Sequence, residues 1–220
     1  TTPIANMNGI GYNTADNFIY GIVSNVLYKI DANGVFYSMG NLNGAASDLA
    51  GSPAAGDFVA PNKLLVYNSG MFLVDVTTRA SIKLSTSGTG FTTGAWDFTV
   101  NGNYAYGLNG TTLGKLDLTA LKTAITANTV TNATTISGTT LSVLAATTAS
   151  APNTNTAPTS GSYGAAYSDL SGNIYFYNNG DYKVFQITKA SLDAGTPKSI
   201  LMSGKASTSL TGPNDGASCP

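Results

Sequence analysis

The chain has 220 residues, only 10% of them charged, and a formal net charge of −1. So small a charge produces no long-range field, which argues against a nucleic-acid or anionic-membrane partner. All the acidic residues are Asp, there is no Glu and no His, and Arg79 is the only Arg, so the usual surface residues of soluble helices are scarce. We find no run of about 20 apolar residues and predict no membrane span.

The stretch of residues 8–42 sets the pattern of the first predicted unit. It contains four short apolar runs, at residues 9–12, 18–23, 26–30 and 35–39. Turn sequences separate the runs: NTADN, then Ser-Asn, then Asp-Ala-Asn-Gly. Short runs rich in Ile, Val, Tyr and Phe are typical of strands, and Asn/Asp/Gly turns between them indicate hairpins. The unit therefore predicts a four-stranded antiparallel meander.

The same unit recurs along the chain. Each copy begins with a strand of small residues, continues through an aromatic strand and an Asn/Gly turn, and reaches a strand that ends near Ile-Asp or Leu-Asp. The predicted units are residues 8–44, 55–88, 94–160 and 163–204. Repeats of roughly 40–50 residues with four strands each are the signature of β-propeller blades. Small residues suit first strands because these strands crowd around the propeller axis.

The third unit is longer than the others. We interpret residues 128–160, which are rich in Thr, Ala, Asn and Ser, as an insertion or as extended outer strands with a loop. Residues 121–127 could instead form a brief helical turn.

After the fourth unit, residues 213–219 resemble one more first strand without its three partners. The predicted fold is therefore all-β, a β-propeller-like ring of four four-stranded antiparallel blades plus the inner strand of a fifth. Three alternatives stay open: the natural chain extends upstream, another chain completes the last blade, or the ring is open. An unpaired strand is a template for pairing, so self-assembly is one expectation. The single Cys219 is expected to be a free thiol or to have a partner outside this chain.

The motifs NGIGYN, LYKID, GAAY and NDGASC occur in this order across nearly the whole chain. In this order they resemble an uncharacterised family of propeller-like domains in large secreted and surface-attached proteins, mostly bacterial. The resemblance implies a β-propeller-like fold and an extracellular or cell-surface location. It brings no catalytic residues with it. The surface composition of Thr, Ser, Asn and Gly with few charges also favours an extracellular location.

Several kinds of chemistry are excluded by composition. Without His there is no Ser-His-Asp triad, no Cys-His pair and no His-ligated transition metal, and a single Cys excludes a thiolate metal site. No Gly-rich phosphate loop ends in Lys-Ser or Lys-Thr. We therefore expect no metal, no cofactor and no catalytic residues.

Carboxylates near the predicted axis are the remaining candidates. Asp57, Asp97, Asp169 and Asp215 lie in or next to the first strands of successive units. A ring of acids near an axis could bind a cation or serve as acid and base. The favoured interpretation is that each Asp instead caps a turn or binds backbone amides.

Aromatic and amide side chains are the candidates for ligand binding. Trp96, together with some of the strand tyrosines, could form a platform on which sugar rings stack, although packing between blades is the favoured role of any single tyrosine. Asn109, Asn178 and Asn179 occupy predicted hairpin turns on one rim, where turn chemistry alone also favours Asn. Asp97 and Asp169 complete the candidate ligand-binding set.

The predicted function is a non-catalytic extracellular or cell-surface module, either an adhesive or ligand-binding domain or the subunit of a surface assembly. Its expected partner is a surface glycan or a protein. The alternative is a carbohydrate-active hydrolase that uses the inner-strand Asp residues. The hydrolase requires two inner-strand carboxylates within about 10 Å of each other across an open pocket.

Overall fold

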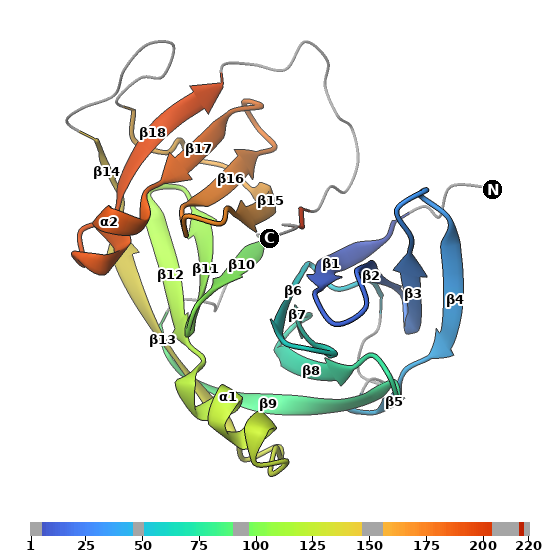
Figure 1. Ribbon diagram of the computed structural model, residues 1–220. Helices are drawn as coiled ribbons and strands as arrows, with labels where there is room; N and C mark the ends of the chain where they lie inside the picture. Colours follow the sequence, from blue (N-terminus) through green and yellow to red (C-terminus); the bar gives the residue numbers. More distant parts are fainter. Residues whose placement is uncertain (1–5, 46–50, 90–96, 147–155, 204–215, 218–220) are drawn as a thin grey trace.

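The computed structural model (Figure 1) describes residues 6–45, 51–89, 97–146, 156–203 and 216–217. Within these residues the chain is built from antiparallel four-stranded meanders. The first meander consists of β1 (Asn8–Asn13), β2 (Phe18–Val23), β3 (Val26–Ile30) and β4 (Phe36–Asn41). The second consists of β6 (Ala55–Ala60), β7 (Lys63–Tyr67), β8 (Met71–Asp75) and β9 (Ala80–Gly88).

The second half of the chain repeats this arrangement. The third meander consists of β10 (Phe98–Asn101), β11 (Tyr104–Asn109), β12 (Thr112–Asp117) and β13 (Thr135–Ser142). The fourth consists of β15 (Tyr163–Ser168), β16 (Ile174–Asn178), β17 (Val184–Ile187) and β18 (Lys198–Ser203). The remaining elements are β5 (Asn43–Gly44), β14 (Leu144–Ala145), α1 (Thr119–Thr126) and α2 (Lys189–Asp193).

The outer strands connect some of the meanders into larger sheets. β9 and β13 pair in parallel, so the second and third meanders share one nine-stranded sheet, which also includes β5. β14 pairs in parallel with β18 and extends the fourth meander to five strands. The first meander stays a separate four-stranded sheet.

The first strand of each meander lies toward the centre of the molecule, and the fourth strand lies at the periphery (Figure 1). β1 packs beside β6, β6 beside β10, and β10 beside β15. The approach of β1 to β6 depends on glycine, because a Cβ on Gly56 would lie 2.7 Å from the backbone carbonyl carbon of Gly9. This crowding is the physical reason for the small residues that mark the start of the first two units in the sequence.

The hydrophobic core consists of layers between neighbouring meanders. Between the first and second meanders, Ile22 and Leu27 pack with Leu64 and Phe72. Further layers lie between the second and third meanders, around Leu65 and Leu116, and between the third and fourth. In the last of these layers the fully buried side chains include Leu108, Tyr163, Phe176 and Phe185. Each sheet is thus stabilised chiefly by burying apolar area against its neighbours.

Two short helices interrupt the strands. α1 covers most of the predicted helical turn at residues 121–127 and begins two residues earlier, at Thr119. The Asp117 carboxylate accepts a hydrogen bond from the Thr119 amide (2.8 Å). The sequence did not predict α2, in which the Thr188 hydroxyl accepts a hydrogen bond from the Ser191 amide and Leu192 is buried. No helix among the described residues is long and apolar enough to cross a membrane.

Residues 216–217 lie apart in sequence but close to the centre, where a Cβ on Gly216 would be 3.0 Å from the carbonyl oxygen of Ala166 in β15. This is the side of β15 on which a further first strand would pack. The rest of the predicted closing strand at residues 213–219, including Asp215, lies outside the described residues.

Candidate functional site

A pocket of about 270 Å³ lies where the carboxyl ends of β1, β6, β10 and β15 converge. We call it the axial pocket. Its lining residues include Tyr12, Thr14, Asp57, Phe58, Pro61 and Ser168. The lining therefore combines hydroxyl groups and one carboxylate with an apolar wall, a composition that suits a small polar organic ligand.

The edge of the axial pocket at β1 is held by a buried amide. Asn13 stands between Tyr12 and Thr14 and is fully buried. Its side-chain Nδ2 donates to Oδ1 of Asn62 (2.8 Å), and its Oδ1 accepts from the backbone amide of Asn62 (3.1 Å). The turn after β1 is thereby fixed to the turn after β6, so both sides of the pocket are held in place before any ligand arrives.

Asp57 links two first strands. Its Oδ2 accepts hydrogen bonds from the amide of Val100 in β10 (2.7 Å) and from the Thr99 hydroxyl (3.3 Å), and its Oδ1 accepts from the amide of Phe58 (2.8 Å). Burial raises the pKa of Asp57 to about 6, although the amides of Val100 and Phe58, the Thr99 hydroxyl and Lys122 favour the charged form. The axial pocket therefore contains a carboxyl group that changes charge just below neutral pH.

Asp97 makes the same kind of link one strand further on. It is fully buried, its Oδ2 accepts from the amide of Ala166 in β15 (2.7 Å), and its Oδ1 accepts from the amide of Phe98 (2.8 Å). Its own amide donates to the carbonyl of Tyr163 (2.8 Å). The carboxylates of Asp57 and Asp97 thus connect successive first strands. Of the two, only Asp57 lines the axial pocket.

Asp169 lies in the turn that follows β15, next to Ser168. Its Oδ1 accepts from the amides of Ser171 and Asn173 (both 2.9 Å), and its Oδ2 accepts from the Asn173 side chain (2.9 Å) and the Tyr175 hydroxyl (2.8 Å). Burial opposes ionisation, but the hydrogen bonds from Asn173 and Tyr175 hold the pKa of Asp169 below its ordinary value. The predicted ligand-binding role of this residue stays a prediction.

The three predicted asparagines lie at the end of the sheets opposite the axial pocket. This follows because β11 runs antiparallel to β10, and β16 runs antiparallel to β15. Asn178 is fully buried: its Nδ2 donates to the Thr159 hydroxyl (3.1 Å), and its Oδ1 accepts from the Gly180 amide (2.7 Å). Among the described residues, the buried Oδ1 of Asn179 has no hydrogen-bond partner. Asn109 is exposed at the end of β11. Their role in ligand binding is a prediction that the structure leaves open.

Two further sequence candidates, Trp96 and Cys219, lie outside the described residues. Within the described ranges, no group of three or more Asp or other metal-ligating side chains could hold a metal ion. The sequence did not predict that Tyr12, Thr14 and Ser168 line one pocket. The signal that could have found them is their shared position at the end of each unit's small-residue strand.

Sheets that pack face to face, with their first strands at the centre and a pocket at the ends of those strands, define an all-β, β-propeller-like protein. The chain belongs to the DUF6923 family, a repeat of unknown function whose family model matches residues 1–220. No curated protein matches the sequence.

Two solved structures from Bacteroides thetaiotaomicron share the fold. The first is a quinonprotein alcohol dehydrogenase-like protein, with 11% identity and a TM-score of 0.54 over 99% of this chain and 48% of that one. The second is a structural genomics protein of unknown function, with 13% identity and a TM-score of 0.53 over 94% of this chain and 51% of that one. At such identities the similarity shows the fold alone.

A virginiamycin B lyase from Staphylococcus aureus is also similar, with 13% identity and a TM-score of 0.45 over 100% of this chain and 62% of that one. The chain thus spans about half to three fifths of the length of these three structures.

Proposed function

We propose that this protein is a non-catalytic module of a secreted or cell-surface protein and that its axial pocket binds a small hydroxylated ligand, such as the end of a glycan. In this proposal the meanders are four propeller blades, at about residues 8–44, 55–88, 94–160 and 163–204. Residues 213–219 supply the first strand of a fifth blade.

The observation that carries the proposal is the hydrogen bonding of the carboxylates on the first strands. Asp57 and Asp97 each accept a hydrogen bond from a backbone amide of the next first strand, and the distance from nitrogen to oxygen is 2.7 Å in both cases. A glycosidase needs two carboxyl groups that face the substrate and are free to exchange protons or attack. Carboxylates that satisfy amides of the neighbouring strand favour a scaffold role instead.

The lining of the axial pocket supports a hydroxylated ligand. Phe58 and Pro61 offer apolar surface to the C–H groups of a sugar, while the Thr14 hydroxyl and the Asp57 carboxylate offer hydrogen-bonding atoms. A ligand hydroxyl that donates to the Asp57 carboxylate would bind best above the pKa of that group, about 6.

A glycan array with the intact chain at pH 7, run beside a panel of chromogenic glycosides, tests this proposal. We expect saturable binding to a restricted set of glycans and no turnover of any glycoside. An array without any specific binding would contradict a glycan-binding role. Turnover would contradict the non-catalytic assignment.

One observation favours the alternative, a carbohydrate-active hydrolase: Asp57 lines a pocket and has a raised pKa, as general acids often do. The hydrolase predicts glycoside turnover whose pH profile changes near 6 and which the Asp57→Asn variant loses. The binding module predicts that wild type and Asp57→Asn are equally inactive.

Assembly with a second copy is the partner interaction we propose. Gly216 packs against β15 where a fifth blade would begin, and strands from another chain would complete that blade. Light scattering with and without reductant tests this. We expect a mass that rises with protein concentration, and a monomer at all concentrations would contradict it.

A further inference from the structure

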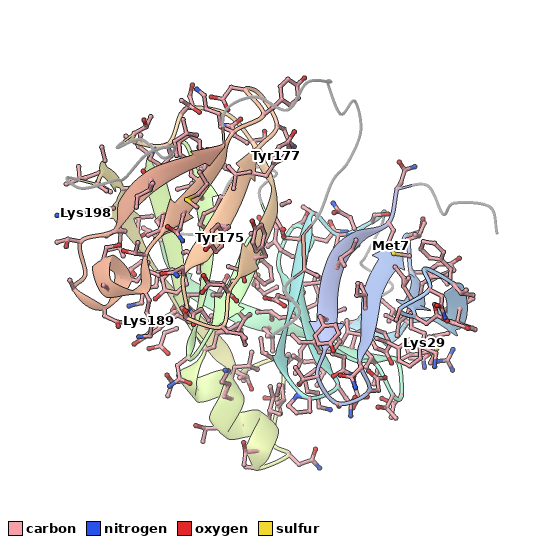
Figure 2. The ribbon with its side chains drawn as sticks, turned by 45° about the horizontal axis from the view of Figure 1, so that its top comes forward. Met7, Lys29, Tyr175, Tyr177, Lys189 and Lys198 are labelled. Carbon is pink, nitrogen blue, oxygen red and sulfur yellow. The ribbon has the colours of Figure 1, made fainter. Side chains whose placement is uncertain are left out.

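A second pocket, of about 210 Å³, lies between the turn that joins β10 to β11 and the helix α2. We call it the rim pocket. Its lining includes Asn101, Tyr104, Tyr106, Lys189, Leu192 and Asp193, and it shares no residue with the axial pocket. Figure 2 shows Lys189 on the side of the fourth sheet that carries α2.

Tyr106 supplies a hydrogen-bonding group to the rim pocket. Tyr106 is only 5% exposed, and it lines the rim pocket. Burial, together with the charges of Tyr104 and Asp193, raises the pKa of Tyr106 to about 12, so the phenol stays protonated. Because Tyr106 lines the rim pocket, a ligand atom in that pocket could take up a hydrogen bond from its hydroxyl in place of water.

The walls of the rim pocket are aromatic and apolar. The rings of Tyr104 and Tyr106 lie 6.1 Å apart with their planes tilted by 55°. The ammonium group of Lys115 lies 3.8 Å from the centre of the Tyr104 ring and holds that ring from one face. Leu192 adds aliphatic surface. Aromatic and aliphatic walls of this kind pack against the C–H faces of sugar rings.

The polar side of the rim pocket is held in place by neighbouring groups. Lys189 and Asp193 form an ion pair one helical turn apart on α2. The backbone amide of Lys189 donates to Oδ1 of Asn173 (3.0 Å), which fixes the start of α2 to the turn after β15. Asn101 donates to the carbonyl of Gly172 (2.7 Å), so its side chain is anchored too. The charged groups balance each other, which favours a neutral ligand with several hydroxyls.

We propose that the rim pocket binds a neutral pyranose, whose ring packs on Tyr104 and Leu192 and whose hydroxyls bond to Tyr106 and to the Lys189–Asp193 pair. This site goes beyond the axial-pocket function and does not depend on it. The Tyr106 hydroxyl would donate to a ring or hydroxyl oxygen, while Asp193 would accept from an adjacent hydroxyl.

NMR titration of the intact chain with single neutral monosaccharides (glucose, galactose, mannose and N-acetylglucosamine) tests this site. We expect one of them to shift the amide signals of Tyr104, Tyr106 and α2 in a saturable way. The Tyr106→Phe variant should bind that sugar about fivefold more weakly, which is the loss expected for one hydrogen bond.

Tyr182→Phe is the matched control, since it removes a phenol hydroxyl outside both pockets, and it should bind as wild type does. Asp193→Asn is a second variant with an expected loss of similar size, and it keeps the test valid should Tyr106→Phe fail to fold. Absence of shifts at the rim pocket with all four sugars would overturn the proposal, as would unchanged affinity in both rim variants. Neither result would affect the axial pocket.

Discussion

Asp57 lies both at the junction of two first strands and in the wall of the axial pocket. Its carboxylate connects β6 to β10, and it also lines the axial pocket. A carboxyl group surrounded by protein loses hydration, and here that loss outweighs the backbone hydrogen bonds that favour the charged form. The protein therefore retains a group whose charge depends on pH close to the neutral range.

The raised pKa of Asp57 makes folding stability depend on pH. Its pKa of about 6 in the folded protein lies above the ordinary value of about 3.9, so the folded state binds the proton more tightly. Its contribution to stability is full below pH about 4 and is lost as the pH rises through about 6. We expect the stability advantage of wild type over Asp57→Asn to shrink by about 3 kcal/mol between these limits. Urea unfolding of both proteins across this range measures it, and a constant difference would contradict the raised pKa.

Asp97 allows a prediction about the link between first strands. The Asp97→Ala variant leaves the buried amides of Phe98 and Ala166 without their carboxylate partner. We expect the free energy of unfolding to fall by about 3 kcal/mol, because each unsatisfied buried donor is costly. Asp117→Ala is the matched control: its carboxylate accepts from the exposed end of α1, and we expect a loss of about 1 kcal/mol. Equal losses in chemical denaturation would argue against a special role of Asp97.

At the scale of elements, the sequence predicted the strands best where local chemistry sets their ends. β2 and β3 have the predicted bounds, residues 18–23 and 26–30, since turn residues fix both ends of each. β9 runs for nine residues, to Gly88, because it pairs with β13 as well as with β8. The pairing of β13 could not be foreseen, because its sequence TISGTTLS has few apolar residues and its stability comes from neighbouring strands.

The short helix α2 escaped prediction for a related reason. Five residues are too few to show a helical period, and α2 depends on the Thr188 cap and on the burial of Leu192. The rim pocket depends on α2, so it could not be predicted either. The axial pocket joins residues from four separate repeats, and only the packing of the first strands brings them together.

Close packing of β1 on β6 can be tested at Gly56. In a Gly56→Ala variant the new Cβ would lie 2.7 Å from backbone atoms of Gly9, which cannot rotate away as a side chain would. We therefore expect β1 and β6 to separate, with a loss of about 3 kcal/mol in stability. Gly34→Ala has open space around its Cβ and a φ of +73°, so it reports backbone strain alone, about 1 kcal/mol. A thermal scan that ranks the two variants equally would contradict the close approach.

At the scale of the whole molecule, the layered core explains how a chain with few charges folds. Each sheet buries apolar side chains against the next, and the first strands converge where small residues allow it. The predicted all-β, propeller-like character is confirmed, because repeats with strand chemistry encode it directly. The number of blades and the partner that completes the ring are proposals, since residues beyond the repeats decide them.

In our proposal, the axial pocket of this propeller-like module binds a hydroxylated ligand without converting it. Calorimetry with the strongest glycan from the array tests it most directly, using wild type, Thr14→Val and Thr140→Val. Thr14→Val removes one hydroxyl from the pocket. Thr140→Val removes one hydroxyl from an exposed position of β13.

We expect Thr14→Val to bind about fivefold more weakly than wild type, Thr140→Val to bind equally well, and the glycan to be recovered intact. Unchanged affinity in Thr14→Val, or a cleaved glycan, would contradict the claim.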